Sequence, residues 1–163
     1  MKIGIFIGSD SDYDVIKDAV DLLKKFAVPF RLEVTSAHRT PKRTIHLLEE
    51  FEREGAAVFI VVAGKAAHLA GVVAAHTLCP VIGVPAGGQR LGGLDALLST
   101  VQMPRGIPVA CMGIGSSGGV NAALLALQIL ALEDGTLRKK LEDFRTEMAS
   151  HVEESSKRIQ EKL

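Results

Sequence analysis

The sequence predicts a three-layer α/β fold, in which a parallel five-stranded sheet is covered by helices on both faces and followed by a C-terminal amphipathic helix. Along the 163 residues, apolar runs of strand length alternate five times with segments of helical periodicity. Apolar residues make up 47% of the chain and aromatic residues only 4%, so Val, Ile, Leu and Ala must form the core. That composition suits a parallel sheet buried on both faces.

Five short segments are predicted as strands, and apart from the second they are apolar runs. They cover residues 3–7, 30–35, 57–63, 81–84 and 109–114. The expected strand order is the flavodoxin-like 2-1-3-4-5. In such sheets ligands bind beyond the carboxyl ends of the strands, where the connectivity reverses.

The helices are predicted from apolar residues at helical spacing and from start signals such as Pro41 after Thr40. They cover about residues 11–26, 40–55, 66–76, 94–100 and 118–132. The last of these is apolar nearly all round and is expected to be buried. The glycine-rich residues 86–93 are expected to form a loop.

The composition changes near Gly135. Residues 136–163 are highly charged and carry an apolar stripe at helical spacing: Leu137, Leu141, Phe144, Met148 and Val152. This helix is expected to pack either on its own domain or on a neighbouring subunit. We therefore expect a single domain over 1–163, with a core over 1–132 and a helical extension over 133–163 that serves in oligomer assembly.

The charge balance argues against nucleic acid or a membrane as a partner. The chain has 19 basic and 19 acidic residues and a formal net charge of +0. It shows neither a signal peptide at its start nor an apolar stretch long enough to span a membrane. Cys79 and Cys111 are expected to be buried free thiols, and the expected location is the cytoplasm. No spacing of His, Cys or carboxylates suggests a metal site.

The segment Gly8-Ser9-Asp10-Ser11-Asp12 follows the first predicted strand. Serine hydroxyls and the amides at the start of the next helix suit a phosphate group, and Asp12 suits ribose hydroxyls. The same residues would also serve as a helix N-cap without any ligand. The segment is neither a Walker loop nor a G-x-G-x-x-G fingerprint.

The segment Ser36-Ala37-His38-Arg39-Thr40-Pro41 follows the second predicted strand. A histidine can give and take a proton near neutral pH, and an arginine beside it can pair with phosphate or carboxylate. The dipoles of a phosphate site and Arg39 should lower the pKa of Asp10 and Asp12, so these carboxylates suit proton transfer near neutral pH less well than His38 does. A solvent-exposed loop histidine remains the alternative.

The segment Ala63-Gly64-Lys65-Ala66-Ala67-His68-Leu69 follows the third predicted strand. Its small residues allow backbone amides to approach a bound carboxylate, or they serve tight packing of helix on sheet. The proline-rich turn over 102–108 is expected to be structural.

Other ligand-binding families with this topology fit less well. A receiver domain needs a phospho-acceptor aspartate where Ala63-Gly64-Lys65 stands, and a flavin site needs aromatic residues that the loops lack. A nicotinamide-dependent enzyme needs the glycine fingerprint.

Six stretches carry a resemblance to a known family. They are GSDSD at 8–12, SAHRTP at 36–41, AAHL at 66–69, PVIGVP at 80–85, GLDALLSTVQMPRGIPVA at 93–110 and NAALLALQIL at 121–130. With these stretches, which run in order over about 1–132, the chain resembles the N5-carboxyaminoimidazole ribonucleotide mutase family, also called the catalytic subunit of phosphoribosylaminoimidazole carboxylase.

The resemblance implies interconversion of N5-carboxyaminoimidazole ribonucleotide and 4-carboxy-5-aminoimidazole ribonucleotide in purine biosynthesis, with no metal, ATP or organic cofactor. It also implies a homo-octamer and a functional link to the ATP-dependent enzyme that makes the carbamate substrate. Carried over by position, His38 is the general acid and base. Ser9, Asp12 and Arg39 would hold the ribose phosphate. The carboxylate and base would be held by Ser36, Ala63, Gly64 and the stretch from Ala66 to Leu69. The whole expected binding set comes from the three loops: Gly8, Ser9, Asp10, Ser11, Asp12, Ser36, Ala37, Arg39, Ala63, Gly64, Lys65, Ala66, His68 and Leu69.

Lys65 and Ala70 depart from the family's pattern, because many bacterial members read GGAAHLP where this chain reads GKAAHLA. Lys65 falls where the family's other class, which carboxylates aminoimidazole ribonucleotide with free carbon dioxide, tends to carry an arginine. That class usually reads SAHK and lacks AAHL. Arg39 and His68 therefore favour the mutase, and Lys65 keeps the carboxylase as the alternative; a solvent-facing Lys65 would favour neither.

Overall fold

The computed structural model describes residues 2–88 and 91–163 and contains one five-stranded sheet in the order β2-β1-β3-β4-β5. Every neighbouring pair is parallel. The predicted α/β fold class and strand order are therefore confirmed. The strands are β1 (Ile3–Ile7), β2 (Phe30–Val34), β3 (Val58–Ala63), β4 (Val81–Pro85) and β5 (Ala110–Cys111).

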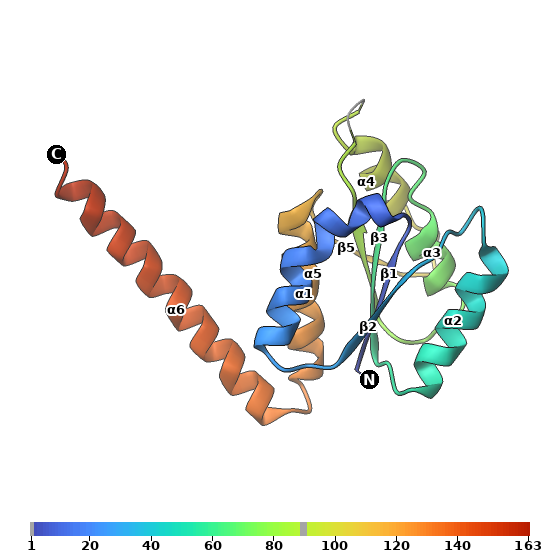
Figure 1. The fold of residues 1–163 in the computed structure, drawn as a ribbon, viewed down its shortest axis with the longest axis horizontal. Helices are drawn as coiled ribbons and strands as arrows, with labels where there is room; N and C mark the ends of the chain where they lie inside the picture. The colour runs from blue at the N-terminus through green and yellow to red at the C-terminus, as the bar shows by residue number, and fades with distance from the viewer. Residues whose placement is uncertain (1, 89–90) are drawn as a thin grey trace. The chain divides into compact units, whose positions relative to one another are not determined.

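Helices cover both faces of the sheet, with α1 and α5 on one side and α2, α3 and α4 on the other (Figure 1). A short 3₁₀ helix, η1, precedes α1. The bounds are η1 (Asp10–Asp12), α1 (Tyr13–Lys25), α2 (Pro41–Arg53), α3 (Leu69–Ala74), α4 (Leu94–Val101), α5 (Ser116–Leu130) and α6 (Gly135–Gln160).

The core on the α2 side is built around three stacked phenylalanines. Phe6 on β1 lies with its ring centroid 4.9 Å from that of Phe51 on α2 and 5.9 Å from that of Phe59 on β3. All three side chains are fully buried. Burial of each contributes roughly 1.5–3 kcal/mol, so this cluster fixes α2 on the sheet.

Arg31 ties the edge strand β2 to α2. Its guanidinium donates hydrogen bonds to Glu33, Glu50 and Glu54, and it lies 4.7 Å above the ring of Phe51. The hydrogen bond from Arg31 lowers the pKa of Glu50. Three carboxylates converging on one cation cover the open edge of the sheet with charge, which disfavours pairing with another strand.

The start of α5 packs tightly against α1. A Cβ on Gly119 would collide with the carbonyl group of Val15, and one on Gly118 would collide with Gly113. The two glycines are therefore required by close backbone approach.

Two elements are shorter than their apolar runs predicted. β5 covers Ala110–Cys111 rather than 109–114, because Pro108 has no N–H to donate at its start and the glycines from Gly113 onward turn the chain. α3 begins at Leu69 rather than near Ala66, because the preceding residues form tight turns, with the N–H of Ala67 donating to the carbonyl of Lys65.

The cysteines also differ from expectation. Cys79 and Cys111 are free, but each is partly exposed rather than buried. Cys79 lies just before β4, and Cys111 lies on the edge strand β5.

The chain divides into two compact units, Met1–Ala126 and Leu127–Leu163. The second unit contains the end of α5 and the long helix α6, whose N-cap Asp134 accepts a hydrogen bond from the N–H of Leu137 at 3.0 Å. None of the helices in the described ranges is long and apolar enough to cross a membrane.

Candidate functional site

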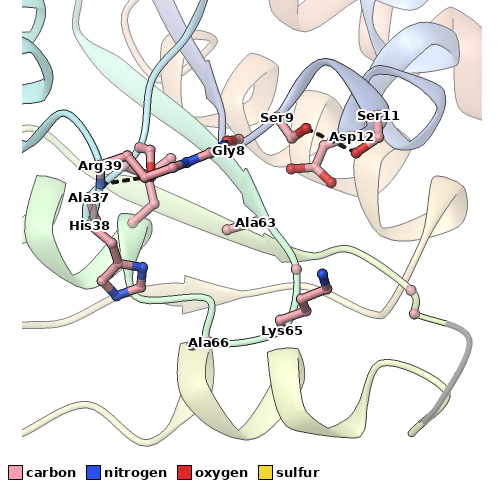
Figure 2. A pocket seen from close by; sticks show the side chains of 15 residues that line it. Gly8, Ser9, Ser11, Asp12, Ala37, His38, Arg39, Ala63, Lys65 and Ala66 are labelled. Atoms are coloured by element: carbon pink, nitrogen blue, oxygen red, sulfur yellow. Dashed lines mark hydrogen bonds between the residues drawn. The ribbon is translucent and has the colours of Figure 1, made fainter.

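The loops after β1, β2, β3 and β4 surround one cavity at the carboxyl edge of the sheet (Figure 2). Its volume is about 540 Å³. This is the edge at which the topology predicts a ligand, since β1 and β3 flank the point where the connectivity reverses. The cavity is lined by Gly8, Ser9, Ser11, Asp12, Ser36, Ala37, His38, Arg39, Ala63, Gly64, Lys65, Ala66, Leu69, Gly87 and Gly88.

The first loop is held by its own polar side chains. The Ser9 hydroxyl and the Ser11 N–H both donate to one carboxylate oxygen of Asp10 at 2.9 Å, and the Ser11 hydroxyl donates to that of Ser9 at 3.1 Å. The bond from Ser9 lowers the pKa of Asp10, as predicted. Asp10 does not line the cavity, so it orders the loop and presents the two serine hydroxyls.

Asp12 behaves differently from the expectation. Its carboxyl group is half-buried, and that burial raises its pKa. The prediction of a lowered pKa was wrong for Asp12, because loss of water contacts outweighs the backbone N–H groups at Ser9 and Gly8.

The second loop is fixed by Thr40 and Ser36. The Thr40 hydroxyl accepts the N–H of Ser36 at 3.0 Å, and the Ser36 hydroxyl accepts the backbone N–H of Arg39 at 3.2 Å. The guanidinium of Arg39 then donates to the carbonyl of Gly8 at 3.2 Å. Arg39 therefore joins the first and second loops, and its cation lies next to the serine hydroxyls.

His38 meets His68 across the loops. Nε2 of His38 lies 2.9 Å from Nδ1 of His68, and the two rings pack edge to face with centroids 5.0 Å apart. One ring must donate this hydrogen bond and the other accept it, so the bond cannot form when both rings are fully protonated. The sequence reasoning missed this pairing because the two residues are 30 positions apart.

The third loop brings small side chains and one lysine to the cavity. Ala63 and Leu69 are buried at its base, while Lys65 and Ala66 are exposed to the opening. Lys65 has a φ of 56°, in the left-handed region that favours glycine. Figure 2 shows its amino group turned toward the cavity from the side away from His38.

Most of the predicted site residues meet in this cavity, and two do not line it. Asp10 supports the first loop, and His68 contacts His38. Gly87 and Gly88 were not predicted, although the glycine-rich run over 86–93 was the available signal. Within residues 2–88 and 91–163, no three His, Cys, Asp or Glu side chains gather in a way that could hold a metal ion.

Comparison with known proteins identifies the family. The family model described as AIR carboxylase matches residues 2–151. The N5-carboxyaminoimidazole ribonucleotide mutase of Methanocaldococcus jannaschii is 51% identical over 98% of this chain and 98% of the relative. The enzymes of that name from Pyrococcus horikoshii and Escherichia coli are 47% and 46% identical, over 98% and 94% of this chain and 89% and 91% of the relatives.

The fold comparison agrees with the sequence comparison. The crystal structure of Treponema denticola PurE superimposes with a TM-score of 0.85 at 27% identity, over 93% of this chain and 94% of that one. The family match and the curated relatives each extend over nearly the whole chain, and the chain therefore belongs to the AIR carboxylase family.

Proposed function

We propose that this protein is an isomerase of purine biosynthesis that interconverts N5-carboxyaminoimidazole ribonucleotide and 4-carboxy-5-aminoimidazole ribonucleotide. The observation that carries the proposal is the cavity in which His38 and Arg39 lie beside the serine-rich first loop, in a chain of this family. A proton-transfer group, an anion-binding group and a pocket of small residues are what this reaction requires.

The phosphate end of the substrate would lie between the first and second loops. Ser9, Ser11 and Arg39 offer hydroxyl and guanidinium donors around Gly8, which suits an anionic group. Asp12 is placed to accept hydrogen bonds from ribose hydroxyls. A fixed phosphate orients the ring of the substrate relative to His38.

The base and carboxylate would lie over the third loop. Its small residues Ala63, Gly64 and Ala66 allow backbone groups to approach the ligand, and the buried Leu69 closes the base of the cavity. Ser36 and Ala37 would cover the other side. A site with little room for water retains carbon dioxide after it leaves one atom and before it joins another.

The reaction balances with one proton-transfer group and no oxidant. The bond between the exocyclic nitrogen and the carboxyl carbon breaks, carbon dioxide departs, and the nitrogen takes a proton from His38. The ring carbon C4 then attacks carbon dioxide to form a carbon–carbon bond, and His38 removes the proton from C4. Such acid and base catalysis contributes on the order of 100- to 10,000-fold.

His68 would act through His38. The 2.9 Å hydrogen bond between the rings fixes the orientation of the His38 imidazole. His68 is the N-cap residue of α3 and does not itself line the cavity, so its role would be to orient His38.

A second candidate function is carboxylation of aminoimidazole ribonucleotide by free carbon dioxide. Its one ground is that Lys65, which lines the cavity, stands where the carbon-dioxide-using class tends to carry an arginine. Incubation of purified protein with each ribonucleotide, with and without bicarbonate, separates the two. Product from the carbamate substrate without bicarbonate supports the mutase, product only from aminoimidazole ribonucleotide with bicarbonate supports the carboxylase, and no product from either contradicts both.

The carbamate substrate is labile, so the ATP-dependent enzyme that makes it is the expected functional partner.

Other features of the chain bear on its location and assembly. We propose the cytoplasm as the location, because the two cysteines are free rather than paired in a disulfide. We also propose a homo-octamer, which the exposed apolar residues of α6 support.

A further inference from the structure

Lys65 combines a left-handed backbone with a side chain that lines the cavity. Among the described non-glycine residues, Ala27 is the other one with a positive φ, at 57°. The N–H of Ala27 closes the turn at the end of α1 by donating to the carbonyl of Lys24. Lys65 ends no helix, since it lies in the loop between β3 and α3. A helix-end turn therefore explains the conformation of Ala27 but not that of Lys65.

The amino group of Lys65 makes no ion pair with any described residue. Arg39, the other permanent cation of the cavity, already donates to Gly8 and Ser36 on the opposite side. In Figure 2 the two cations lie at opposite ends of the cavity, with Ala63 between them in the view. An unpaired ammonium group in a concave site attracts an anion, so the cavity offers two separate anion-binding ends.

The ligand of the proposed reaction also has two anionic ends. Its phosphate suits the side with the serine hydroxyls and Arg39. Its carboxylate then falls over the third loop, where Gly64 and Ala66 flank Lys65 and leave its side chain as the longest one in that part of the loop. Glycine would adopt the left-handed backbone at position 65 without steric cost, so the backbone conformation does not account for a lysine there. The property that lysine adds at this position is its charge.

We propose that Lys65 is a positioning and specificity-determining residue, whose ammonium group binds the carboxylate that moves during the reaction. This inference rests on the proposed function. It makes the protein select carboxylated ribonucleotides over aminoimidazole ribonucleotide, and it holds the carboxylate in reach of both nitrogen and C4 without taking part in proton transfer.

Binding measurements on matched variants test the inference. Lys65→Met removes the charge and keeps the length, whereas Lys65→Arg keeps both. Dissociation constants are measured by calorimetry for 4-carboxy-5-aminoimidazole ribonucleotide and for aminoimidazole ribonucleotide. Lys65→Met should weaken binding of the carboxylated ligand on the order of tenfold and leave the other within about twofold, while Lys65→Arg should retain most of the preference.

Either of two other results overturns the inference. Equal weakening of both ligands by Lys65→Met would mean that the ammonium group binds the phosphate, and unchanged binding of both would mean that it faces solvent. The proposed function is tested separately by turnover of the wild-type protein, which can succeed while the Lys65 inference fails. A wild-type protein that binds neither ribonucleotide contradicts both.

A stability comparison guards against a folding artefact. Lys65→Gly and Ala27→Gly both place glycine on a left-handed backbone, so neither should lower the melting temperature. Lys65→Gly should lose the preference for the carboxylated ligand, as Lys65→Met does, and Ala27→Gly should keep it. Loss of the preference in both glycine variants would assign it to the general stability of the fold and overturn the inference.

Discussion

At the scale of single residues, the imidazole rings of His38 and His68 are joined by one hydrogen bond. His38 lines the cavity and His68 does not, so the two should respond differently to substitution. His38→Asn should fold normally, still bind the ribonucleotide, and lose turnover by at least about a hundredfold, because asparagine can donate hydrogen bonds but cannot titrate. Steady-state kinetics and ligand binding on the same preparation provide the measurement.

The matched variant is His68→Asn. It should retain measurable turnover and alter the pH profile, since the partner that orients His38 is changed but the proton-transfer group remains. Normal turnover of folded His38→Asn together with an inactive His68→Asn would assign the catalytic role to His68.

Asp12 gives a second test at this scale, through pH. Burial raises the pKa of its carboxyl group above the ordinary value of 3.8, so the folded protein holds that proton more tightly than the unfolded chain does. Ionisation of Asp12 therefore costs stability above its folded pKa, and the cost disappears as the pH falls below 3.8. Asp12→Asn should be at least as stable as wild type at pH 7 and lose that advantage toward pH 3, in chemical denaturation followed by circular dichroism.

The same variant should bind the ribonucleotide more weakly, on the order of tenfold, because a carboxylate accepts hydrogen bonds from hydroxyls more strongly than an amide does. A buried carboxylate kept at the expense of stability is typical of a binding residue. An Asp12→Asn protein less stable than wild type at pH 7 would instead assign Asp12 a structural role.

Residue types and positions along the chain identified the three loops, because each loop follows a predicted strand, and the strands before the first and third loops are clear apolar runs. Contacts between loops could not be read in this way. The bond between His38 and His68 depends on how far the third loop extends before α3 begins, and the raised pKa of Asp12 depends on how deeply its carboxyl group is buried. Both are consequences of packing rather than of local sequence.

At the scale of elements, the contact between α1 and α5 makes a sharp prediction. Gly119→Ala places a methyl group against the carbonyl of Val15 and should destabilise the protein by about 1–3 kcal/mol, as overpacking does. Gly135→Ala is the matched control, since nothing lies within 4 Å of a Cβ there and alanine is the better helix former. Denaturant unfolding of the two variants measures the difference. Equal stability of Gly119→Ala and wild type would mean that the two helices pack less closely.

β5 and α3 are both shorter than the sequence predicted, and for the same reason. Apolar runs report burial, but strand and helix bounds also require backbone hydrogen bonds. Val109 to Ile114 is apolar enough for a long strand, yet β5 pairs with β4 through only two residues. Residues Lys65 to His68 form tight turns instead of helical hydrogen bonds, so α3 begins only at Leu69. The cavity lies beside these turns.

At the scale of the whole molecule, the highly charged helix α6 also exposes large apolar side chains. Met148 is 51% exposed and Val152 71% exposed, on the stripe that the sequence predicted. Apolar residues aligned along one helix face are typical of a protein–protein contact. The sequence predicted the amphipathic helix itself, because periodicity is local, but local sequence does not tell which surface the apolar stripe contacts.

If α6 joins neighbouring subunits of a homo-octamer, charge on its apolar stripe should dissociate the assembly. The double variant Met148→Glu and Val152→Glu buries two carboxylates in that contact and should give smaller species in sedimentation velocity at micromolar concentration. Ser150→Glu is the control, because at 3.6 residues per turn it lies about 200° around the helix from Met148 and should leave the assembly intact. An octamer that survives the double variant would place the contact on another surface, and a stable wild-type monomer would exclude the octamer altogether.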